Sequence, residues 1–420
     1  MRPMNGMDQD PGSSQAVAPH RLRQAATERG LCIDDGFTWR ISSRLCLGVE
    51  HGDYNGAELL GIGIDRFLWI AARDNSTRTA RLFSCNRTDD GLVVFDPATP
   101  QKASRNAAAS DWSPFAHGAA DVLRSRGHAV RRGFDAVVYS EIPGGGMSRS
   151  AALSIALLLT FAVEPRALLA DRMELARMAQ AIENEHLGSP CGILDPLVIA
   201  HAQRGAAVRY QPDGDRVTHI PWGGDPMQLC VLALDTGRSR HGLQQATYPE
   251  RVRECAQIVA LAQPTLGGQS LAHLASGDRY ERTLQLLTNA PSGLSARLRY
   301  LNGAIARFPR MLAAFAAGDA RELGRCMRED GISLRSDYCI SGSELEGMCE
   351  IARAHPGSFG ERMLGGGDCG ASGAIVDPAC AEDILAAVQR EYPKRFPAFA
   401  HAFATHRCAM ADGIAAVALR

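Results

Sequence analysis

A glycine run between an apolar strand and an apolar helix constrains the fold of this chain more than any other feature of its sequence. Residues 134–142 are patterned as a strand, Pro143 and three glycines follow, and a helix is predicted over 150–163. Glycine lets backbone N–H groups approach an anion closely, and a helix start adds partial positive charge. The segment therefore predicts a phosphate-binding turn. A plain strand-to-helix turn, capped by Ser148 or Ser150, is the alternative.

A second glycine-rich segment spans residues 362–370 and leads into the apolar residues 374–376. Four of its glycines lie within six positions, which allows backbone amides to face another side of a ligand. An ordinary hairpin turn is the alternative for this segment.

The periodicity of apolar residues predicts an α+β chain. Strands are expected over 38–47, 57–72 and 229–235, and helices over 21–30, 172–185, 248–262, 296–317 and 320–327. Strands mixed with helices around two glycine-rich loops favour two lobes divided near residue 225. We therefore expect a disordered tail at 1–20, a first domain at 21–225 and a second domain at 226–420.

Charge and cysteine spacing exclude several classes of protein. The formal net charge is −1, so neither nucleic acid nor an anionic membrane is implied as a partner. No apolar run reaches the roughly 18 residues that a membrane span needs, and the first twenty residues lack the apolar stretch of a secretory leader. The twelve cysteines form no Cys-x-x-Cys pair, which is typical of reduced cytoplasmic thiols, so we expect neither disulfides nor zinc.

The scarcity of lysine excludes one kind of nucleotide site. Lysine occurs only at Lys102 and Lys394, so the sequence lacks the Gly-Lys-Ser/Thr triplet of a P-loop. A triphosphate would have to be bound here without that lysine, through the backbone amides of a glycine-rich loop.

A cluster of polar side chains follows the strand predicted over 38–47. Glu50, His51 and Asp53 surround a single glycine, and Tyr54 comes next. Carboxylates accept paired hydrogen bonds from neighbouring hydroxyls, and histidine can donate or accept, so the cluster suits a polyol. A solvated loop is the alternative.

Asp195 stands among apolar residues just after a tight turn. Flanked by Ile193, Leu194 and Pro196, its carboxylate is expected to be half-buried, which costs free energy unless the charge is paired. Arg44 is a natural partner that would keep the carboxylate ionised and ready to accept a hydroxyl proton. The alternative is an aspartate that caps the following helix.

Six segments in order resemble the galactokinase family of the GHMP kinase superfamily, over about residues 35–380. Residues 43–54 resemble G-R-V-N-L-I-G-E-H-x-D-Y, residues 143–152 resemble P-x-G-x-G-L-S-S-S-A, and residues 191–195 resemble C-G-I-M-D. Residues 362–370 resemble R-M-T-G-G-G-F-G-G. Two further stretches agree: 235–251 with D-T-x-V-R-H and Y-x-x-R-R, and 333–341 with S-L-R-D-D-Y-x-V-S.

The resemblance implies a two-lobed GHMP kinase fold, with a ribosomal S5-like N-terminal domain, a ferredoxin-like C-terminal domain and an active site in the cleft between them. It implies a kinase that uses ATP and Mg²⁺ to phosphorylate the anomeric (C1) hydroxyl of galactose or of a galacto-configured or higher-carbon sugar. The expected partners are therefore a sugar and ATP, with no nucleic acid and no membrane. A monomer or homodimer in the cytoplasm is expected.

The same resemblance implies roles residue by residue. Asp195 would take the proton from the anomeric hydroxyl, and Arg44 would orient Asp195 and stabilise charge on the transferring phosphoryl group. The remaining residues implied are Glu50, His51, Asp53, Gly192 and Tyr248 for the sugar; Gly144, Gly145, Gly146, Ser148, Arg149 and Ser150 for the nucleotide; and Ser150 and Glu183 for Mg²⁺.

The chain departs from the family pattern near both implied substrates. The phosphate loop is one residue shorter after Pro143, and Arg149 stands where the family has a serine. Gly52 replaces the usual threonine, and Asp368 with Cys369 replaces Phe-Gly. These changes leave the identity of the sugar open. They also keep a rival interpretation, a catalytically silent galactokinase-like sugar sensor.

Overall fold

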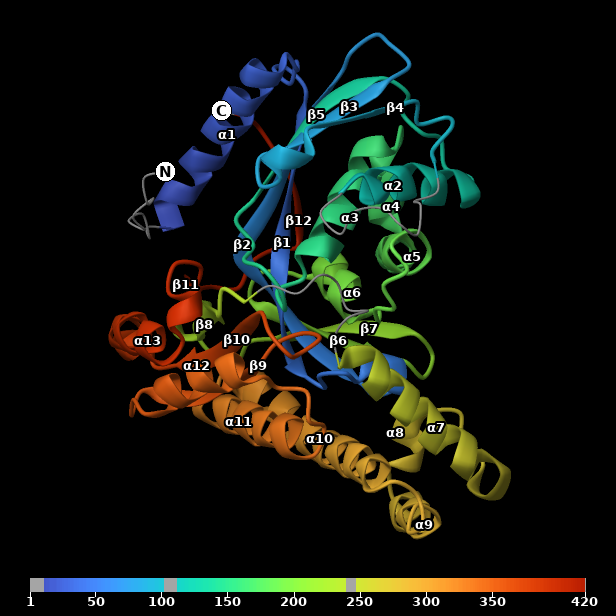
Figure 1. Cartoon of the computed structure of the whole chain (residues 1–420), viewed down its shortest axis with the longest axis vertical. Helices are drawn as coiled ribbons and strands as arrows, with labels where there is room; N and C mark the ends of the chain where they lie inside the picture. Colours follow the sequence, from blue (N-terminus) through green and yellow to red (C-terminus); the bar gives the residue numbers. More distant parts are fainter. Residues whose placement is uncertain (1–10, 102–111, 239–246, 420) are drawn as a thin grey trace.

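The structure is a computed structural model that describes residues 11–101, 112–238 and 247–419. Two β-sheets with helices packed on them form two lobes (Figure 1), so the α+β, two-lobed fold class predicted from the sequence is confirmed. Residues 239–246, which carry part of the motif matched over 235–251, lie outside the described residues.

The first lobe is built on an eight-stranded sheet with the order β12-β1-β2-β5-β3-β4, to which β6 and β7 attach through β2. Among the described strands of this sheet, β3 and β5 pair in parallel and the other pairs are antiparallel. The strands are β1 (Phe37–Gly48), β2 (Leu59–Asp74), β3 (Ala80–Ser84), β4 (Leu92–Phe95), β5 (Phe134–Ser140), β6 (Ala206–Gln211), β7 (Arg216–Pro221) and β12 (Ile414–Val417). The C-terminal strand β12 thus joins the first sheet, across the domain division predicted near residue 225.

Helices cover both faces of this sheet because side chains alternate along its strands. On β2, Trp69 packs with α1 (Pro11–Arg29), and its neighbour Ile70 belongs to the core beneath the helices of the other face. Those helices are α2 (Ser113–Ser125), α3 (Arg149–Phe161), α4 (Pro165–Ala170), α5 (Arg172–Ala181) and α6 (Leu194–His201). Figure 1 shows α1 alone on one side of the sheet and this group on the other.

The start of the first helix corrects one prediction from the sequence. The tail expected to be disordered covered residues 1–20, of which residues 1–10 lie outside the described part of the chain. From Pro11 the chain is helical, and Ala18 and Leu22 are fully buried against the sheet. Burial of these apolar side chains stabilises the helix upstream of the predicted start at residue 21.

The second lobe is built on a four-stranded antiparallel sheet with the order β11-β8-β10-β9. Its strands are β8 (Cys230–Asp235), β9 (Ser358–Met363), β10 (Ala371–Val376) and β11 (Ala404–Cys408). Its helices are α7 (Tyr248–Leu266), α8 (Leu271–Leu274), α9 (Asp278–Leu286), α10 (Ser292–Ala317), α11 (Ala320–Ser336), α12 (Ser343–Arg353) and α13 (Ala381–Arg395).

Short 3-10 segments occur in both lobes, at Asp53–Asn55, Thr88–Asp90, Pro226–Gln228, Pro378–Cys380 and Pro397–Phe399, and a π-helical turn occurs at Ile182–His186.

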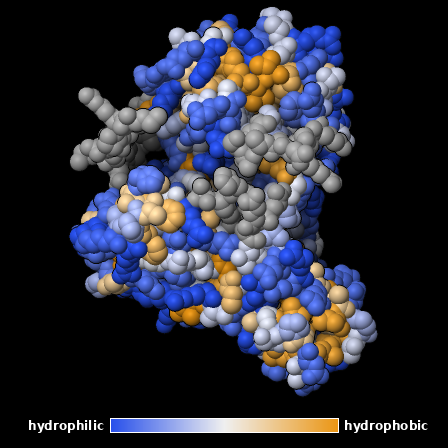
Figure 2. Space-filling view, in the orientation of Figure 1, coloured by the Kyte–Doolittle hydropathy of each residue, from blue (hydrophilic) through white to orange (hydrophobic). Residues whose placement is uncertain are grey.

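The surface is largely hydrophilic, and Figure 2 shows hydrophobic residues both at the top of the first lobe and at the tip formed by α7 to α9. Leu261 on α7 and Leu286 on α9 are exposed there. Within the described part of the chain, no helix combines the length and apolar character that crossing a bilayer requires.

Candidate functional site

Arg44 contacts both segments that were predicted to carry the chemistry, the one with Asp195 and the glycine-rich turn. It lies on β1 with only 1% of its surface exposed. Its Nε and Nη2 donate hydrogen bonds of 2.8 and 2.6 Å to Oδ1 of Asp195, and its Nη1 donates one of 2.9 Å to the carbonyl of Gly146. Burial lowers the pKa of Arg44, but the carboxylates of Asp195 and Glu50 outweigh it and raise the pKa above its ordinary value. The arginine, the carboxylate and the glycine turn are therefore in direct contact.

Asp195 lies in the first turn of α6 and does not cap this helix. The N-cap residue is Ile193, and no side chain makes a capping bond there. Arg44 contacts only Oδ1 of Asp195, and among the described residues no hydrogen bond to Oδ2 is formed. About a third of the Asp195 side chain is exposed, so this second oxygen is left for another partner.

Asp53 holds the turn that precedes α6. Its carboxylate accepts hydrogen bonds from the N–H of Leu194 at 3.1 Å and of Tyr54 at 3.0 Å. Burial raises the pKa of Asp53, and these backbone donors partly oppose the rise. A Cβ at position 192 would lie 1.6 Å from Oδ2 of Asp53, so the turn requires Gly192. These contacts bring two of the residues predicted to bind the sugar together beside Asp195.

Aromatic side chains from both lobes surround His51. Tyr248, the first residue of α7, lies with its ring centroid 5.5 Å from that of His51. The Tyr54 hydroxyl lies 3.1 Å from Nδ1 of His51 and 2.6 Å from the hydroxyl of Tyr338. Tyr338 was not predicted as a site residue, although it belongs to the matched segment 333–341. His51 is buried, which rules out a solvated loop at this point.

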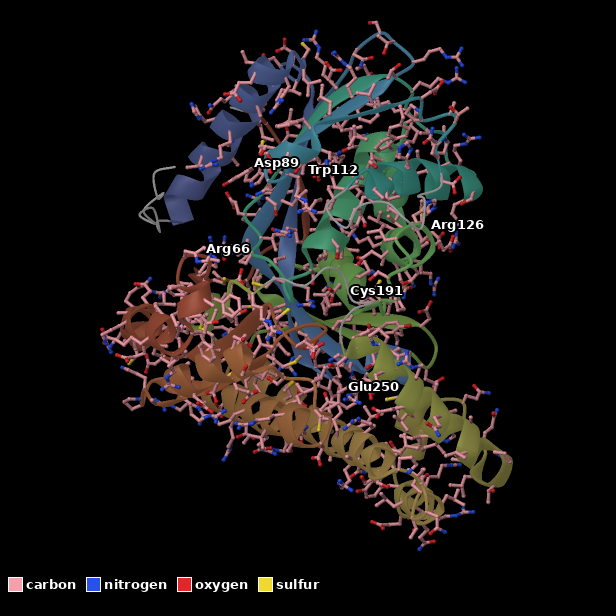
Figure 3. The ribbon with its side chains drawn as sticks, in the orientation of Figure 1. Arg66, Asp89, Trp112, Arg126, Cys191 and Glu250 are labelled. Atoms are coloured by element: carbon pink, nitrogen blue, oxygen red, sulfur yellow. The ribbon has the colours of Figure 1, made fainter. Side chains whose placement is uncertain are left out.

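The loop before α6 and the first turn of α7 approach each other from the two lobes, and Figure 3 labels Cys191 on the first and Glu250 on the second. Burial raises the pKa of Tyr248 well above its ordinary value, and the nearby carboxylate of Asp53 raises it further. The predicted sugar residues of the two lobes therefore lie within electrostatic reach of one another.

Glu50 takes part in a buried ion network. Its carboxylate accepts a 2.9 Å hydrogen bond from Nη2 of Arg362, which also bonds the carbonyl of Cys46 and pairs with Asp330. Burial raises the pKa of Glu50 to about 7, although Arg362 and Arg44 act to lower it. Glu50 is thus engaged by Arg362 in this structure, and its contact with a sugar remains a prediction. No pattern in the sequence indicated this network, because its members are distant along the chain.

The two glycine-rich loops lie against each other. A Cβ on Gly146, which has φ +81°, would lie 2.6 Å from the carbonyl oxygen of Leu364. The segment 364–370 joins the antiparallel strands β9 and β10, so it is a hairpin connection, as the alternative predicted. It also packs on the loop predicted to bind phosphate. In the loop predicted to bind phosphate, the backbone N–H of Gly144 donates a hydrogen bond of 3.1 Å to Asp235.

The start of α3 offers groups that fit a phosphate. Ser148 is the N-cap residue, but its hydroxyl makes no capping bond. Its Oγ is buried and has no hydrogen-bond partner among the described residues. A buried hydroxyl without a partner is costly, and a phosphate oxygen would satisfy it. The next residue, Arg149, is exposed and lies within electrostatic reach of Asp235 and Arg87.

The predicted Mg²⁺ ligands Glu183 and Ser150 are in contact. Burial raises the pKa of Glu183 to about 7, the charge of Asp195 raises it further, and a hydrogen bond with the Ser150 side chain opposes the rise. Two oxygen ligands fit Mg²⁺, which binds few protein groups beside water and phosphate. A cation would also offset the repulsion between the two carboxylates. Among the described residues, no group of three or more His, Cys, Asp or Glu side chains has metal-binding geometry.

A pocket of about 380 Å³ lies on the first lobe, outside the predicted site. Its lining includes Gln180 and Asn184, whose side-chain amides hydrogen-bond the backbone of Cys191. None of the residues predicted for sugar, nucleotide or metal lines it.

Two comparisons of the sequence with known proteins found relatives. Residues 114–203 match the GHMP kinases N terminal domain. Galactokinase from Chloroflexus aggregans is 32% identical over 358 residues, which cover 85% of this chain and 88% of that protein. Galactokinase from Roseiflexus sp. is 30% identical over 345 residues, or 82% of this chain and 84% of that protein.

Solved structures show a similar fold. The structure of Lactococcus lactis galactokinase complexed with galactose matches with a TM-score of 0.83 at 24% identity, covering 95% of this chain and 99% of that one. The mevalonate kinase of Methanococcus jannaschii matches with a TM-score of 0.60 at 15% identity, covering 90% and 99%.

Proposed function

Because the chain belongs to the galactokinase family of GHMP kinases, we propose that this sugar kinase phosphorylates the anomeric C1 hydroxyl of galactose or of a galacto-configured or higher-carbon sugar. Sugar kinase activity and the use of ATP follow from the family. The position phosphorylated and the kind of sugar are the proposed part. The contact of buried Arg44 with both Asp195 and Gly146 carries the proposal, since it joins a base to a phosphate-binding loop.

Asp195 acts as the base in this proposal. Arg44 occupies Oδ1, so Oδ2 accepts the proton of the sugar hydroxyl. Phosphoryl transfer depends mostly on positioning and on electrostatic stabilisation. Arg44 serves both needs, because the same guanidinium fixes Asp195 and faces the loop that would hold the phosphates.

The nucleotide is held by the loop before α3 and by Mg²⁺. We assign the phosphates to the backbone of Gly144, Gly145 and Gly146 and to the start of the helix, where the Ser148 hydroxyl has no partner within the described part of the chain. Arg149 adds positive charge at the same place. Ser150 and Glu183 would hold Mg²⁺, which neutralises charge on the phosphates when bound.

The sugar is held by groups from both lobes. We assign its hydroxyls to His51, Asp53, Tyr248 and the backbone of Gly192, with Glu50 at the edge of this group. The polar clustering of carboxylate, imidazole and phenol groups supports a polyol as the ligand.

We propose a cytoplasmic monomer or homodimer whose partners are the sugar and ATP. All twelve cysteines are free, which supports a reducing compartment. The silent sensor is not favoured, since the curated relatives are named galactokinases.

The test is a panel of free sugars with ATP and Mg²⁺, with mass detection of the phosphorylated product. Galactose or a galacto-configured sugar should give a 1-phosphate. Asp195→Ala should lower kcat by about 1,000-fold, the scale of losing a general base, and leave nucleotide affinity within a few-fold. The exposed Asp213 provides the matched control Asp213→Ala, which should retain activity.

Two results would oppose the proposal. Binding of ATP and Mg²⁺ without turnover of any sugar would support the sensor instead. A rate retained by Asp195→Ala would show that another group is the base.

A further inference from the structure

We propose that Asp368 is a positioning residue for the sugar site, where it fixes Thr247, the N-cap residue of α7, and thereby the side chain of Tyr248. The inference rests on the proposed function, in which Tyr248 contacts the sugar. Residues 362–370 resemble a motif that has phenylalanine at the position of Asp368, so this residue is a departure from the motif.

Two short hydrogen bonds join Asp368 to the start of α7. The N–H of Thr247 donates to Oδ2 and its hydroxyl donates to Oδ1 of Asp368, each at 2.6 Å. Thr247 is the N-cap residue of α7, and its own side chain makes no capping bond. A helix start has N–H groups without partners inside the helix, and a carboxylate there is favoured by the helix dipole. Asp368 supplies that carboxylate from the hairpin between β9 and β10.

Asp368 is itself held on both sides. Its N–H donates to the carbonyl of Ile340 at 2.7 Å. The carbonyl of Asp368 packs on Gly342 so closely that a Cβ there would lie 2.0 Å from the oxygen. Its φ of +61° is a left-handed conformation that aspartate and asparagine adopt more readily than most residues. The carboxylate that meets Thr247 is therefore carried by a fixed backbone.

Tyr248 follows directly and is packed against the first lobe. Its side chain is buried, and its ring lies 5.5 Å from that of His51 and 5.4 Å from that of Tyr54. A movement of Thr247 would shift this ring relative to both. The hairpin that carries Asp368 also packs on Gly146 of the other lobe, so one loop supports the phosphate turn and the tyrosine together.

The test compares variants on both sides of the contact between Asp368 and Thr247. Asp368→Gly removes the carboxylate without backbone strain, because glycine adopts positive φ freely. Asp368→Asn keeps one acceptor for the Thr247 N–H. Thr247→Val removes only the hydroxyl donor, and Thr247→Ser is its matched control. Steady-state kinetics with galactose and ATP are measured for each, together with hydrogen exchange of the first turn of α7.

In Asp368→Gly the KM for galactose should rise about tenfold, the scale of losing hydrogen bonds to a charged acceptor, while the KM for ATP stays within about twofold. Thr247→Val should raise the sugar KM about threefold, whereas Thr247→Ser and Asp368→Asn should stay closer to the unaltered protein. Exchange in the first turn of α7 should speed up in Asp368→Gly. A general loss of stability would not raise the KM for galactose while leaving the KM for ATP unchanged.

An unchanged galactose KM in a folded Asp368→Gly protein, or equal increases in both KM values, would overturn the inference. So would unchanged exchange at α7. If the unaltered protein phosphorylates no sugar, the proposed function fails instead. In that case the exchange measurement still decides whether Asp368 holds the helix.

Discussion

Arg362 offers the sharpest test of how the lobes are held together, through the substitution Arg362→Met. The side chain belongs to β9 of the second lobe and bonds Glu50 and the carbonyl of Cys46 at the end of β1 in the first. Methionine preserves much of the length and the apolar stem but removes the charge. Asp330 keeps a second arginine, Arg307, at 2.8 Å. Glu50 therefore loses its main counter-charge.

The magnitude follows from burial. Glu50 is 2% exposed, and removing one partner of a buried ion pair costs about 3–5 kcal/mol. That is a large part of the roughly 5–15 kcal/mol that stabilises an ordinary domain. The variant should therefore unfold at a much lower urea concentration than the unaltered protein.

The loss should also depend on pH, with a definite sign. Glu50 has a pKa of about 7 in the folded protein against an ordinary value of 4.5, so its burial lowers stability as pH rises from 4.5 to 7 and adds no further loss above 7. Removing Arg362 raises that folded pKa further. The difference between the two proteins should then be constant below pH 7 and grow above it by at most about 1.4 kcal/mol per pH unit.

Urea unfolding followed by circular dichroism at pH 6, 7 and 8.5 measures both effects. Arg395→Met is the matched control, because Arg395 pairs with Glu350 at 3.4 Å on the surface and both side chains are half-exposed. Such a pair contributes about 1 kcal/mol or less. The reasoning is refuted if Arg362→Met costs no more than this control, or if its loss shrinks above pH 7.

Three further substitutions, one of them with a matched control, test other parts of the structure. Gly192→Ala would place a methyl group 1.6 Å from Oδ2 of Asp53, so the sugar KM should rise at least about tenfold, the scale of about 1.4 kcal/mol. Gly293→Ala, whose added carbon meets no atom closer than 3.4 Å, should leave that KM unchanged. Arg149→Ser should raise the KM for ATP and leave that for the sugar unchanged; no change in either KM would show that this side chain does not contact the nucleotide. Burial raises the pKa of Glu141 to about 7, so Glu141→Gln should increase the free energy of unfolding by about 2 kcal/mol at pH 8. The gain should disappear at pH 4.5, and an equal gain at both values in urea titrations would contradict the assignment.

Local patterns predicted much of the fold. The strand before residue 143 and the helix after it are present as β5 and α3, because apolar periodicity and a glycine run are properties of neighbouring residues. The pairing of Asp195 with Arg44 was also expected, since a half-buried carboxylate needs a counter-charge. Its role in catalysis remains a proposal.

Contacts between distant residues were beyond the sequence patterns. Arg362 meets Glu50 and Asp330 only in the folded chain, and nothing near it in sequence marks it as buried. Asp368 was noted as a departure from a motif, yet its bond to Thr247 depends on where α7 begins. The strand β12 has only four residues and no alternation of apolar and polar side chains, so its pairing with β1 defines it.

The pairing of β12 with β1 affects the order in which this chain can fold as it is synthesised. β1 leaves the ribosome long before residues 414–417, because most strands and helices of both lobes lie between them in the chain. Until they emerge, one edge of β1 lacks its partner, and an open strand edge is a site for aggregation. Translation that stops shortly before residue 414 would therefore yield a product that keeps every proposed ligand residue and is still prone to associate with other chains.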